Sequence, residues 1–279
     1  MFLDKTSWIL LLYILRNKNC GRAKYTVMLT FEDCGRPIAH VDSGRFKNQI
    51  ISLISEPDDS KTCLSVPEIA LKDGKIQPIM NTGERQVCYI AGPSGSGKSH
   101  YAANLIKTFK KVFPKKDVFL FSRTSYKDDP AYAKLKPIQI EIDNSLIEDP
   151  IDITELQGGC LIIFDDCNTI PDEDLKKAVM KLMEDIMEVG RKLGIYIIIT
   201  NHLVVPNERK FSRTVLNEMQ SLTFYPKSGS AHQIETCLKK YFGLATKMIR
   251  KIMDLNSRWV TIHKNYPQFI LHEHGALVL

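Results

Sequence analysis

The spacing of apolar and polar residues changes near residue 86. Before that point the apolar stretches are short and separated by turn-forming residues, which predicts a small β-rich segment. Residues 25–31 and 38–41 are β-prone, and residues 46–54 fit a short helix. Asp73-Gly74, between residues 68–72 and 75–79, is typical of a hairpin turn.

From residue 86 onward, apolar strands alternate with amphipathic helices. This order predicts an α/β fold with a mostly parallel central sheet and helices on both faces. Expected strands cover residues 86–91, 117–121, 137–142, 160–164 and 195–200, and expected helices cover 98–113, 172–193, 231–241 and 245–255. Residues 259–263 and 269–271 form a last β-prone stretch.

These changes predict four segments. Residues 1–27 form a leader, 28–80 the β-rich lead-in, 81–226 the α/β core and 227–279 a basic C-terminal extension. The leader contains the apolar stretch WILLLYIL, which is shorter than the roughly 20 residues that a membrane-spanning helix needs. It is either a short buried helix or sequence upstream of a true start at Met28, and we favour the second interpretation.

Composition and charge narrow the class of protein. The 279 residues are 44% hydrophobic and 25% charged, which excludes disordered, collagen-like and coiled-coil proteins. Seven cysteines without a CxxC pair predict free thiols in a reducing, intracellular compartment. The net charge of +6 arises entirely after residue 204, where eleven Lys and Arg residues oppose five Asp and Glu residues. Such an excess can attract a phosphate backbone, although a solvated helix face is the simpler alternative.

A glycine-rich motif follows the first core strand. The octapeptide from Gly92 to Ser99 fits G-x-x-x-x-G-K-[ST] at every fixed position. Its backbone N–H groups and the following helix N-terminus would bind phosphates, Lys98 would reach the β- and γ-phosphates, and Ser99 would ligate Mg²⁺. The expected nucleotide-binding residues are Gly92, Pro93, Ser94, Gly95, Ser96, Gly97, Lys98, Ser99 and the next residue, His100.

Two carboxylates follow a second apolar strand, in the sequence Cys160-Leu161-Ile162-Ile163-Phe164-Asp165-Asp166. Ligands of open α/β sheets bind at the carboxyl ends of the strands. Asp165 is therefore expected to hold Mg²⁺, and Asp166 to orient or deprotonate the attacking water. ATP and Mg²⁺ are the expected cofactors.

Further candidates lie around the strand at residues 195–200. Asn201 and His202 follow its end, where they could report the γ-phosphate, although local capping is an alternative. Arg191 precedes the strand and could reach the nucleotide of a neighbouring subunit, because a planar guanidinium suits phosphate oxygens. Arg209 and Arg213 are competitors for that role.

The sequence GRKLGIYIIITNH at residues 190–202, which comes after the acidic pair, resembles the "GRAxGIHLxLATQ" stretch of the FtsK/HerA superfamily of DNA-pumping ATPases. It is especially similar to the packaging ATPases of large, poxvirus-like DNA viruses. The resemblance covers roughly residues 86–226. It implies a RecA-like P-loop core that works as a pentameric or hexameric ring and threads double-stranded DNA into a capsid, in the host cytoplasm or a viral factory. His202 in place of Gln, and Asp166 in place of the Glu of many relatives, depart from the superfamily pattern.

Other functions remain open at this point. The chain could be another P-loop ATPase acting on DNA or in virus assembly, for example in helicase loading, partition or extrusion. A small-molecule kinase is a further alternative, but its arginine-rich lid is not evident in the sequence.

The basic C-terminal extension would contact DNA phosphates or dock the motor on a capsid, portal or membrane partner. The residues available for this are Lys239, Lys240, Lys247, Arg250 and Lys251.

Overall fold

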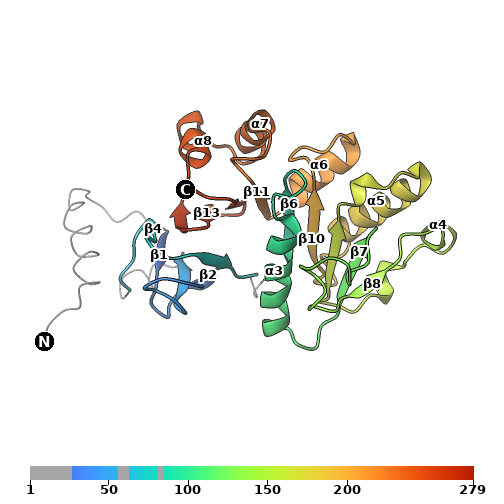
Figure 1. Cartoon of the computed structure of the whole chain (residues 1–279), viewed down its shortest axis with the longest axis horizontal. Helices are drawn as coiled ribbons and strands as arrows, with labels where there is room; N and C mark the ends of the chain where they lie inside the picture. Colours follow the sequence, from blue (N-terminus) through green and yellow to red (C-terminus); the bar gives the residue numbers. More distant parts are fainter. Residues whose placement is uncertain (1–26, 56–62, 81–83) are drawn as a thin grey trace, which may run out of the picture.

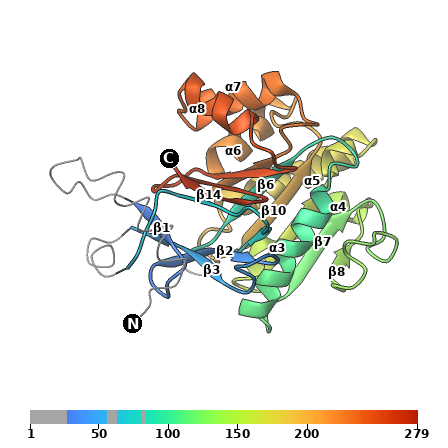
Figure 2. The ribbon, with the colours of Figure 1, turned by 60° about the vertical axis from the view of Figure 1, so that its left-hand side comes forward.

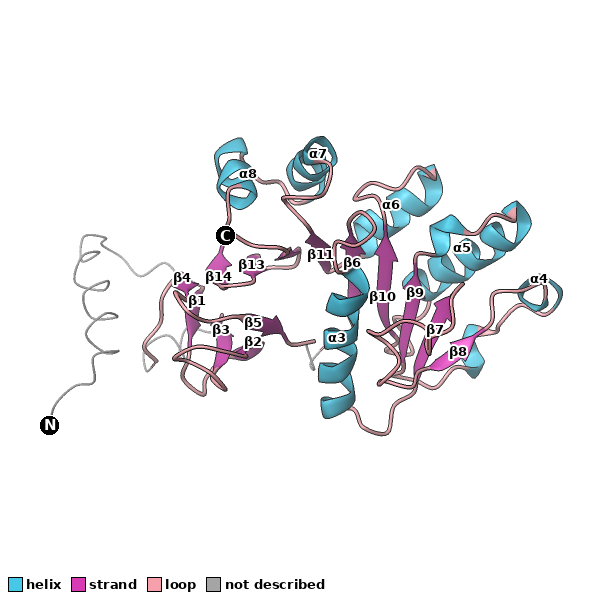
Figure 3. Cartoon of the chain, viewed as in Figure 1, coloured by secondary structure: helices cyan, strands magenta, loops and turns pink. Residues whose placement is uncertain are grey.

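The computed structural model describes residues 27–55, 63–80 and 84–279. It contains a ten-stranded sheet flanked by helices and a smaller four-stranded sheet built from the N-terminal segment (Figure 1). Figure 3 separates the helices from the strands by colour. The small sheet is made of β1 (Met28–Thr30), β2 (Arg36–Val41), β3 (Ile50–Ile54) and β5 (Ile76–Pro78).

The large sheet contains the strands that the sequence predicts and several that it does not. Its strands are β4 (Glu68–Ala70), β6 (Val87–Ala91), β7 (Val118–Ser122), β8 (Ile138–Ile140), β9 (Leu161–Asp165), β10 (Tyr196–Asn201), β11 (Ser221–Phe224), β12 (Val260–His263), β13 (Phe269–His272) and β14 (Gly275–Val278). The helices are α3 (Lys98–Val112), α4 (Ser145–Glu148), α5 (Glu173–Glu188), α6 (Arg209–Glu218), α7 (Ala231–Tyr241) and α8 (Thr246–Met253), with 3-10 turns η1 (Ile153–Glu155) and η2 (Cys167–Thr169).

Six parallel strands form the core of the large sheet, in the order β11-β6-β10-β9-β7-β8. β10 lies between β6, which precedes the glycine-rich motif, and β9, which precedes the acidic pair. One strand therefore lies between the strand that leads into the glycine-rich motif and the strand that leads into the acidic pair. The α/β fold class expected from the sequence is confirmed.

The central strands are apolar on both faces because both faces are covered. One face packs against α5, α6, α7 and α8, and α3 packs against the other (Figure 2). Neighbouring residues of β10 divide between these layers: Ile197 joins the first core and Ile198 the second, and both are fully buried. The residue alternation of the strands thus fixes which helices cover which face.

The C-terminal strands extend the large sheet. β12, β13 and β14 continue it in antiparallel order from β11, and β4 of the N-terminal segment closes the edge. The small sheet packs beneath this extension, where Leu29 and Ile51 share a core with Phe269 and Leu271. The first and last parts of the chain are therefore joined through a common apolar layer.

The structure corrects several sequence-based expectations. Residues 50–54 form β3 rather than the end of a helix, because pairing with β1 and β2 places four of its five residues in the core. The expected hairpin around Asp73-Gly74 does not form: β4 pairs with β14 and β5 pairs with β2, in different sheets. α6, β11 and β14 were not expected, and α5 ends at Glu188, before the turn around Gly190 and Gly194.

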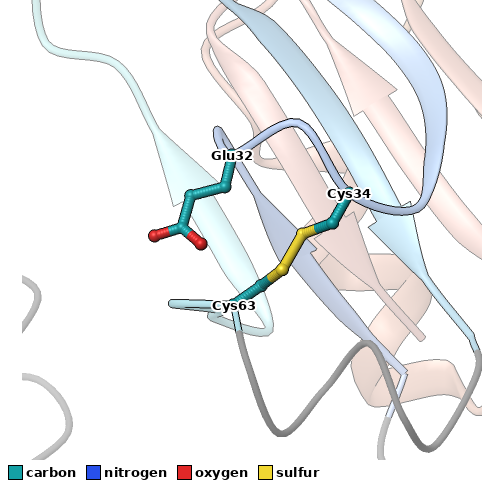
Figure 4. Close-up of side chains that lie close together, drawn as sticks. All are labelled: Glu32, Cys34 and Cys63. Carbon is teal, nitrogen blue, oxygen red and sulfur yellow. A yellow bond between two sulfur atoms is a disulfide. The ribbon is translucent and has the colours of Figure 1, made fainter.

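The interpretation of every cysteine as a free thiol is also wrong. Cys34 and Cys63 form a disulfide, with the carboxylate of Glu32 beside the two sulfurs (Figure 4). These residues are 29 positions apart, and their approach depends on the pairing of Leu29 with Val66, which no sequence spacing reveals. The bonded sulfurs are not thiolates, so the group is not a metal site in this form. Cys88, Cys160, Cys167 and Cys237 are free and buried.

Two sequence-based expectations concern the N-terminal leader and a membrane-spanning helix. Residues 1–26 of the expected leader lie outside the described residues. Among the helices that the structure does describe, none combines the length and the apolarity that crossing a bilayer requires.

Candidate functional site

The glycine-rich motif forms the connection between β6 and α3. The N–H of Gly92 donates to the carbonyl oxygen of Asn201 at 3.0 Å, which ties the start of the loop to the end of β10. α3 begins at Lys98, and its first turn, Lys98–Tyr101, carries no acidic side chain. The N-terminal N–H groups of this helix are therefore available to an anion.

Two glycines are required by the geometry of the loop. Gly97 has a φ of +106°, a backbone conformation that side chains with a Cβ rarely adopt. Gly92 lies against the ring of Tyr225, and a Cβ at this position would come within 2.6 Å of that ring. The contact between the Tyr225 ring and Gly92 thus helps to set the position of the loop.

Lys98 points back into the loop and toward the acidic pair. Its ammonium donates to the Gly92 carbonyl oxygen at 3.0 Å and lies 3.4 Å from Oδ2 of Asp166. Only 6% of the Lys98 side chain is exposed. A buried lysine needs charged or polar partners, and here it has a carboxylate and a carbonyl oxygen.

Thr200, at the carboxyl end of β10, holds the two acidic residues together. Its hydroxyl donates to Oδ1 of Asp165 at 2.9 Å and accepts from the N–H of Asp166 at 2.9 Å. The same hydroxyl is also 3.2 Å from Oδ1 of Asp166. Asp166 has a left-handed backbone (φ 47°), which brings its carboxylate round to face Lys98.

Asp165 and Ser99, the two expected metal ligands, meet at the hydroxyl of Tyr132. This hydroxyl donates to Oδ1 of Asp165 at 3.1 Å and is also hydrogen-bonded to Ser99. Burial is the main cause that raises the pKa of Asp165, and the negative charge of Asp166 adds to it. Hydroxyl and carboxylate oxygens are the donors that Mg²⁺ prefers, and two neighbouring carboxylates favour a divalent cation, so these residues fit Mg²⁺.

A cleft of about 450 Å³ opens between the phosphate loop and the loop that follows β7. Its lining residues are Ser94, Gly95, Gly97, Lys98, Ser99, His100, Asp129, Pro130, Ala131 and Asp166. The cleft is therefore lined by half of the predicted site residues, including the candidate catalytic residues Lys98 and Asp166.

The residues after β10 differ in their relation to this cleft. His202 is part of the acidic cluster, with its Nε2 atom 3.4 Å from Oδ2 of Asp166. Asn201 is 2% exposed, and its side-chain oxygen accepts from the N–H of Leu203 at 3.0 Å. Asn201 thus stabilises its own turn, and its backbone oxygen holds the phosphate loop.

Arg191 lies away from the phosphate loop of its own chain. It precedes β10 at the amino end of the parallel strands, whereas the loop follows the carboxyl end of β6. A six-residue strand separates these two edges by about 20 Å. Arg191 lines a different cavity, beside Arg85 and Glu218. Arg209 and Arg213 are both exposed on α6.

Sequence reasoning missed three residues of this site. Thr200 is only the end of the strand expected at residues 195–200, and neither Tyr132 nor Tyr225 belongs to a motif. Only the position of Thr200, at the carboxyl end of a strand next to the acidic strand, gave a usable signal, because the contacts of both tyrosines depend on how distant loops fold.

Several known proteins are similar to this chain in structure or in sequence. No family model matches the chain. Solved structures that superpose include the DNA-packaging ATPase B204 from Sulfolobus Turreted Icosahedral Virus (14% identity, 69% of this chain and 98% of that chain, TM-score 0.49). Another is the conjugation coupling protein TcpA of pCW3 (12% identity, 85% and 77%, TM-score 0.44).

A curated relative gives the family. "Uncharacterized protein V3" of Sputnik virophage is 43% identical over 244 residues, which cover 88% of this chain and 96% of that protein. With this identity along almost the whole length of both proteins, the chain belongs to the same viral protein family as V3 of Sputnik virophage.

Proposed function

We propose that this protein is an ATP-hydrolysing motor that moves double-stranded DNA, and that it packages a viral genome. The observation that carries the first part is the contact between the phosphate loop and the acidic pair, in which Lys98 lies 3.4 Å from Asp166. Lys98 and Asp166 are 68 positions apart in sequence and line the same cleft. The sequence resemblance to packaging ATPases and the membership in a virophage protein family support the second part.

Each residue of the site has a distinct part in hydrolysis. The loop N–H groups and Lys98 would bind the phosphates, and Lys98 would exchange its contact with Asp166 for the β- and γ-phosphates. Ser99 and Asp165 would hold Mg²⁺, which supplies charge neutralisation on the phosphate oxygens when it is bound. Asp166 would then be free to accept a hydrogen bond from the attacking water, with Thr200 fixing its backbone.

The basic C-terminal helices are the candidate DNA-binding surface. α7 and α8 lie side by side, as both views show (Figures 1 and 2), and the buried residues of both helices belong to the same apolar core. Lys239, Lys240, Lys247 and Arg250 are exposed on these helices, and Lys251 pairs with Glu68 at 3.0 Å. Contacts of this kind bind phosphates irrespective of DNA sequence, which suits a motor that must move along any sequence.

Steady-state ATP hydrolysis with and without double-stranded DNA tests the proposal. We expect DNA to stimulate the wild-type chain several-fold, and Lys98→Ala and Asp166→Asn to abolish turnover. Asp128→Asn is a matched control, because Asp128 is an exposed carboxylate outside the cleft lining. Hydrolysis that is indifferent to DNA would contradict the motor, and phosphoryl transfer to a small acceptor would favour a kinase.

The DNA surface is tested separately by charge reversal. Lys239→Glu combined with Arg250→Glu should remove DNA stimulation and leave basal hydrolysis unchanged, because neither residue lines the cleft. The same reversal at Lys111, exposed near the end of α3, and at Lys115, exposed just after it, is the control and should retain stimulation. Packaging itself requires that turnover depends on an empty capsid of the virus, and the ring of five or six subunits should appear in sizing experiments with ATP.

A further inference from the structure

A second pocket lies on the other side of the phosphate loop. It has a volume of about 200 Å³ and shares Gly97 and His100 with the first cleft. Its walls include the start of α3, the residues after β11 and before β12, β5 of the small sheet, and Asp42 after β2. The phosphate loop thus borders two pockets, and the mechanism above uses only the first of them.

Two of the residues that line this second pocket carry unpaired hydroxyl groups. Among the described residues, the side chains of Ser96 and Tyr225 each bury a hydroxyl that has no hydrogen-bond partner. Tyr225 is only 3% exposed, and burial raises the pKa of its phenol. A buried hydroxyl without a partner is costly, and native proteins rarely leave one unpaired without a reason. Both hydroxyls therefore point to a ligand that supplies the missing hydrogen bonds.

Tyr225 is held in place by its contacts with the phosphate loop. Its ring packs against Gly92 at the start of the phosphate loop. Its hydroxyl lies about 4.0 Å from where a Cβ on Gly97 would stand, at the end of the loop. The phenol therefore lies beneath the loop, and its polar end is at the junction between the loop and the second pocket.

Charge and aromatic surface complete the pocket. The guanidinium of Arg258 comes within 3.3 Å of the same Cβ position on Gly97, so a cation lies beside the loop. Trp259 follows directly, half-buried, with its ring 5.1 Å from that of Tyr101 in an edge-on arrangement. Asp42 and Gln77 of the N-terminal segment add polar groups to the lining. The pocket thus offers a cation next to the phosphates and an indole further away.

We propose that this pocket binds the nucleoside half of a nucleoside triphosphate, an inference that rests on the proposed ATP-binding function. Tyr225 and Arg258 contact the ribose and the α-phosphate, and Trp259 forms the wall against which the base stacks. Base stacking on an aromatic side chain tolerates different bases, and Asp42 and Gln77 supply the polar contacts that can discriminate between them. The small N-terminal sheet is then part of the nucleotide site.

Comparison of ATP with inorganic tripolyphosphate tests this proposal, because tripolyphosphate lacks the nucleoside. Binding of each, with Mg²⁺, is measured by calorimetry on the full chain. Trp259→Leu should weaken ATP binding by about tenfold, and Tyr225→Phe and Arg258→Gln by several-fold, with tripolyphosphate binding changed less than about twofold in Trp259→Leu and Tyr225→Phe. Lys98→Ala should weaken both ligands. Equal effects of Trp259→Leu on both ligands, or none on ATP, would overturn the proposal.

Tryptophan fluorescence gives a second measurement that does not depend on a disruptive variant. The chain has two tryptophans, so in a Trp8→Phe background all the emission comes from Trp259. ATP should quench or shift this emission and tripolyphosphate should not. If tripolyphosphate binds and ATP binds no better, the nucleoside pocket is refuted while phosphate binding stands. If neither ligand binds, the proposed function itself fails.

Discussion

The hydroxyl of Thr200 donates to the carboxylate of Asp165 at 2.9 Å, across two adjacent parallel strands. The same oxygen accepts the backbone N–H of Asp166, at 2.9 Å. Because a hydroxyl has one proton and two lone pairs, it can do both at once. One side chain therefore orients the candidate metal ligand and fixes the strained backbone of the candidate catalytic residue.

Replacement of Thr200 by Val should impair hydrolysis more than it impairs folding. Val keeps the shape of Thr but leaves the Asp166 N–H without its partner, a loss of about 1–3 kcal/mol in the free energy of unfolding. The carboxylate of Asp166 would lose its fixed position, and we expect kcat to fall by at least about tenfold. Thr200→Ser, which keeps the hydroxyl, should retain most of the activity. Equal kcat values for the Val and Ser variants would contradict this role.

The raised pKa of Asp165 predicts that this carboxylate destabilises the nucleotide-free protein. Burial favours the protonated form in the native state, so between the unfolded and the native pKa the native protein binds more protons. Stability then falls as the pH rises through this window above pH 3.8, and the loss persists at neutral pH. Asp165→Asn removes the charge and should raise the melting temperature of the protein at pH 7 while abolishing hydrolysis.

Melting curves with and without Mg²⁺ and ATP measure this effect. Wild-type protein should gain stability from the combination, because a cation at Asp165 offsets the repulsion from Asp166. Asp165→Asn should gain much less from Mg²⁺. The prediction would be contradicted if the variant had a lower melting temperature than the wild type at pH 7. It would also be contradicted if the wild type had the same melting temperature at pH 4 and at pH 7, because the Asp165 carboxylate would then not destabilise the native protein.

The sequence predicted the parts of the fold whose signals are local. The phosphate loop has a fixed spacing, and the strands β6, β9 and β10 are continuous apolar stretches, so each could be located before the structure was known. β3 could not be located from the sequence, because its five residues become a strand only through pairing with β1 and β2. In the site, Lys98 and Asp166 follow from motifs, whereas Tyr132 and Tyr225 reach it through loops whose paths depend on tertiary packing.

Arg191 should act on the nucleotide of a neighbouring subunit. It lies at the opposite edge of the sheet from its own phosphate loop, so a contribution within one chain is excluded by distance. Arg191→Ala should lower kcat by at least about a hundredfold and leave the Kd for ATP unchanged. Lys192→Ala, also exposed and adjacent, is the control.

Mixed rings distinguish this arrangement from a structural effect. Arg191→Ala subunits retain the phosphate loop, and Lys98→Ala subunits retain the arginine, so a mixture should recover part of the activity that each lacks alone. The same mixture made with Arg213→Ala tests the competing arginine on α6. Recovery with Arg213→Ala and none with Arg191→Ala would assign the role to Arg213 instead.

Arg85 should be important for stability, because it holds together the turn that carries Arg191. Its guanidinium donates to the carbonyl oxygens of Ile186 and Met187, at 2.9 and 2.8 Å, and its Nε atom donates to that of Ile195 at 2.8 Å. The last turn of α5 and the start of β10 are thereby joined, with a positive charge at the helix C-terminus, where it is favourable. Arg85→Met keeps the length of the side chain and removes all three hydrogen bonds. We expect urea unfolding to show a loss of about 2–4 kcal/mol in the free energy of unfolding.

The control is Arg123→Met, which removes one exposed hydrogen bond to Thr169 and should lower the free energy of unfolding by less than about 1 kcal/mol. Similar losses for the two variants would show that the α5–β10 corner does not depend on Arg85, and that the position of Arg191 is set by the backbone of the turn alone.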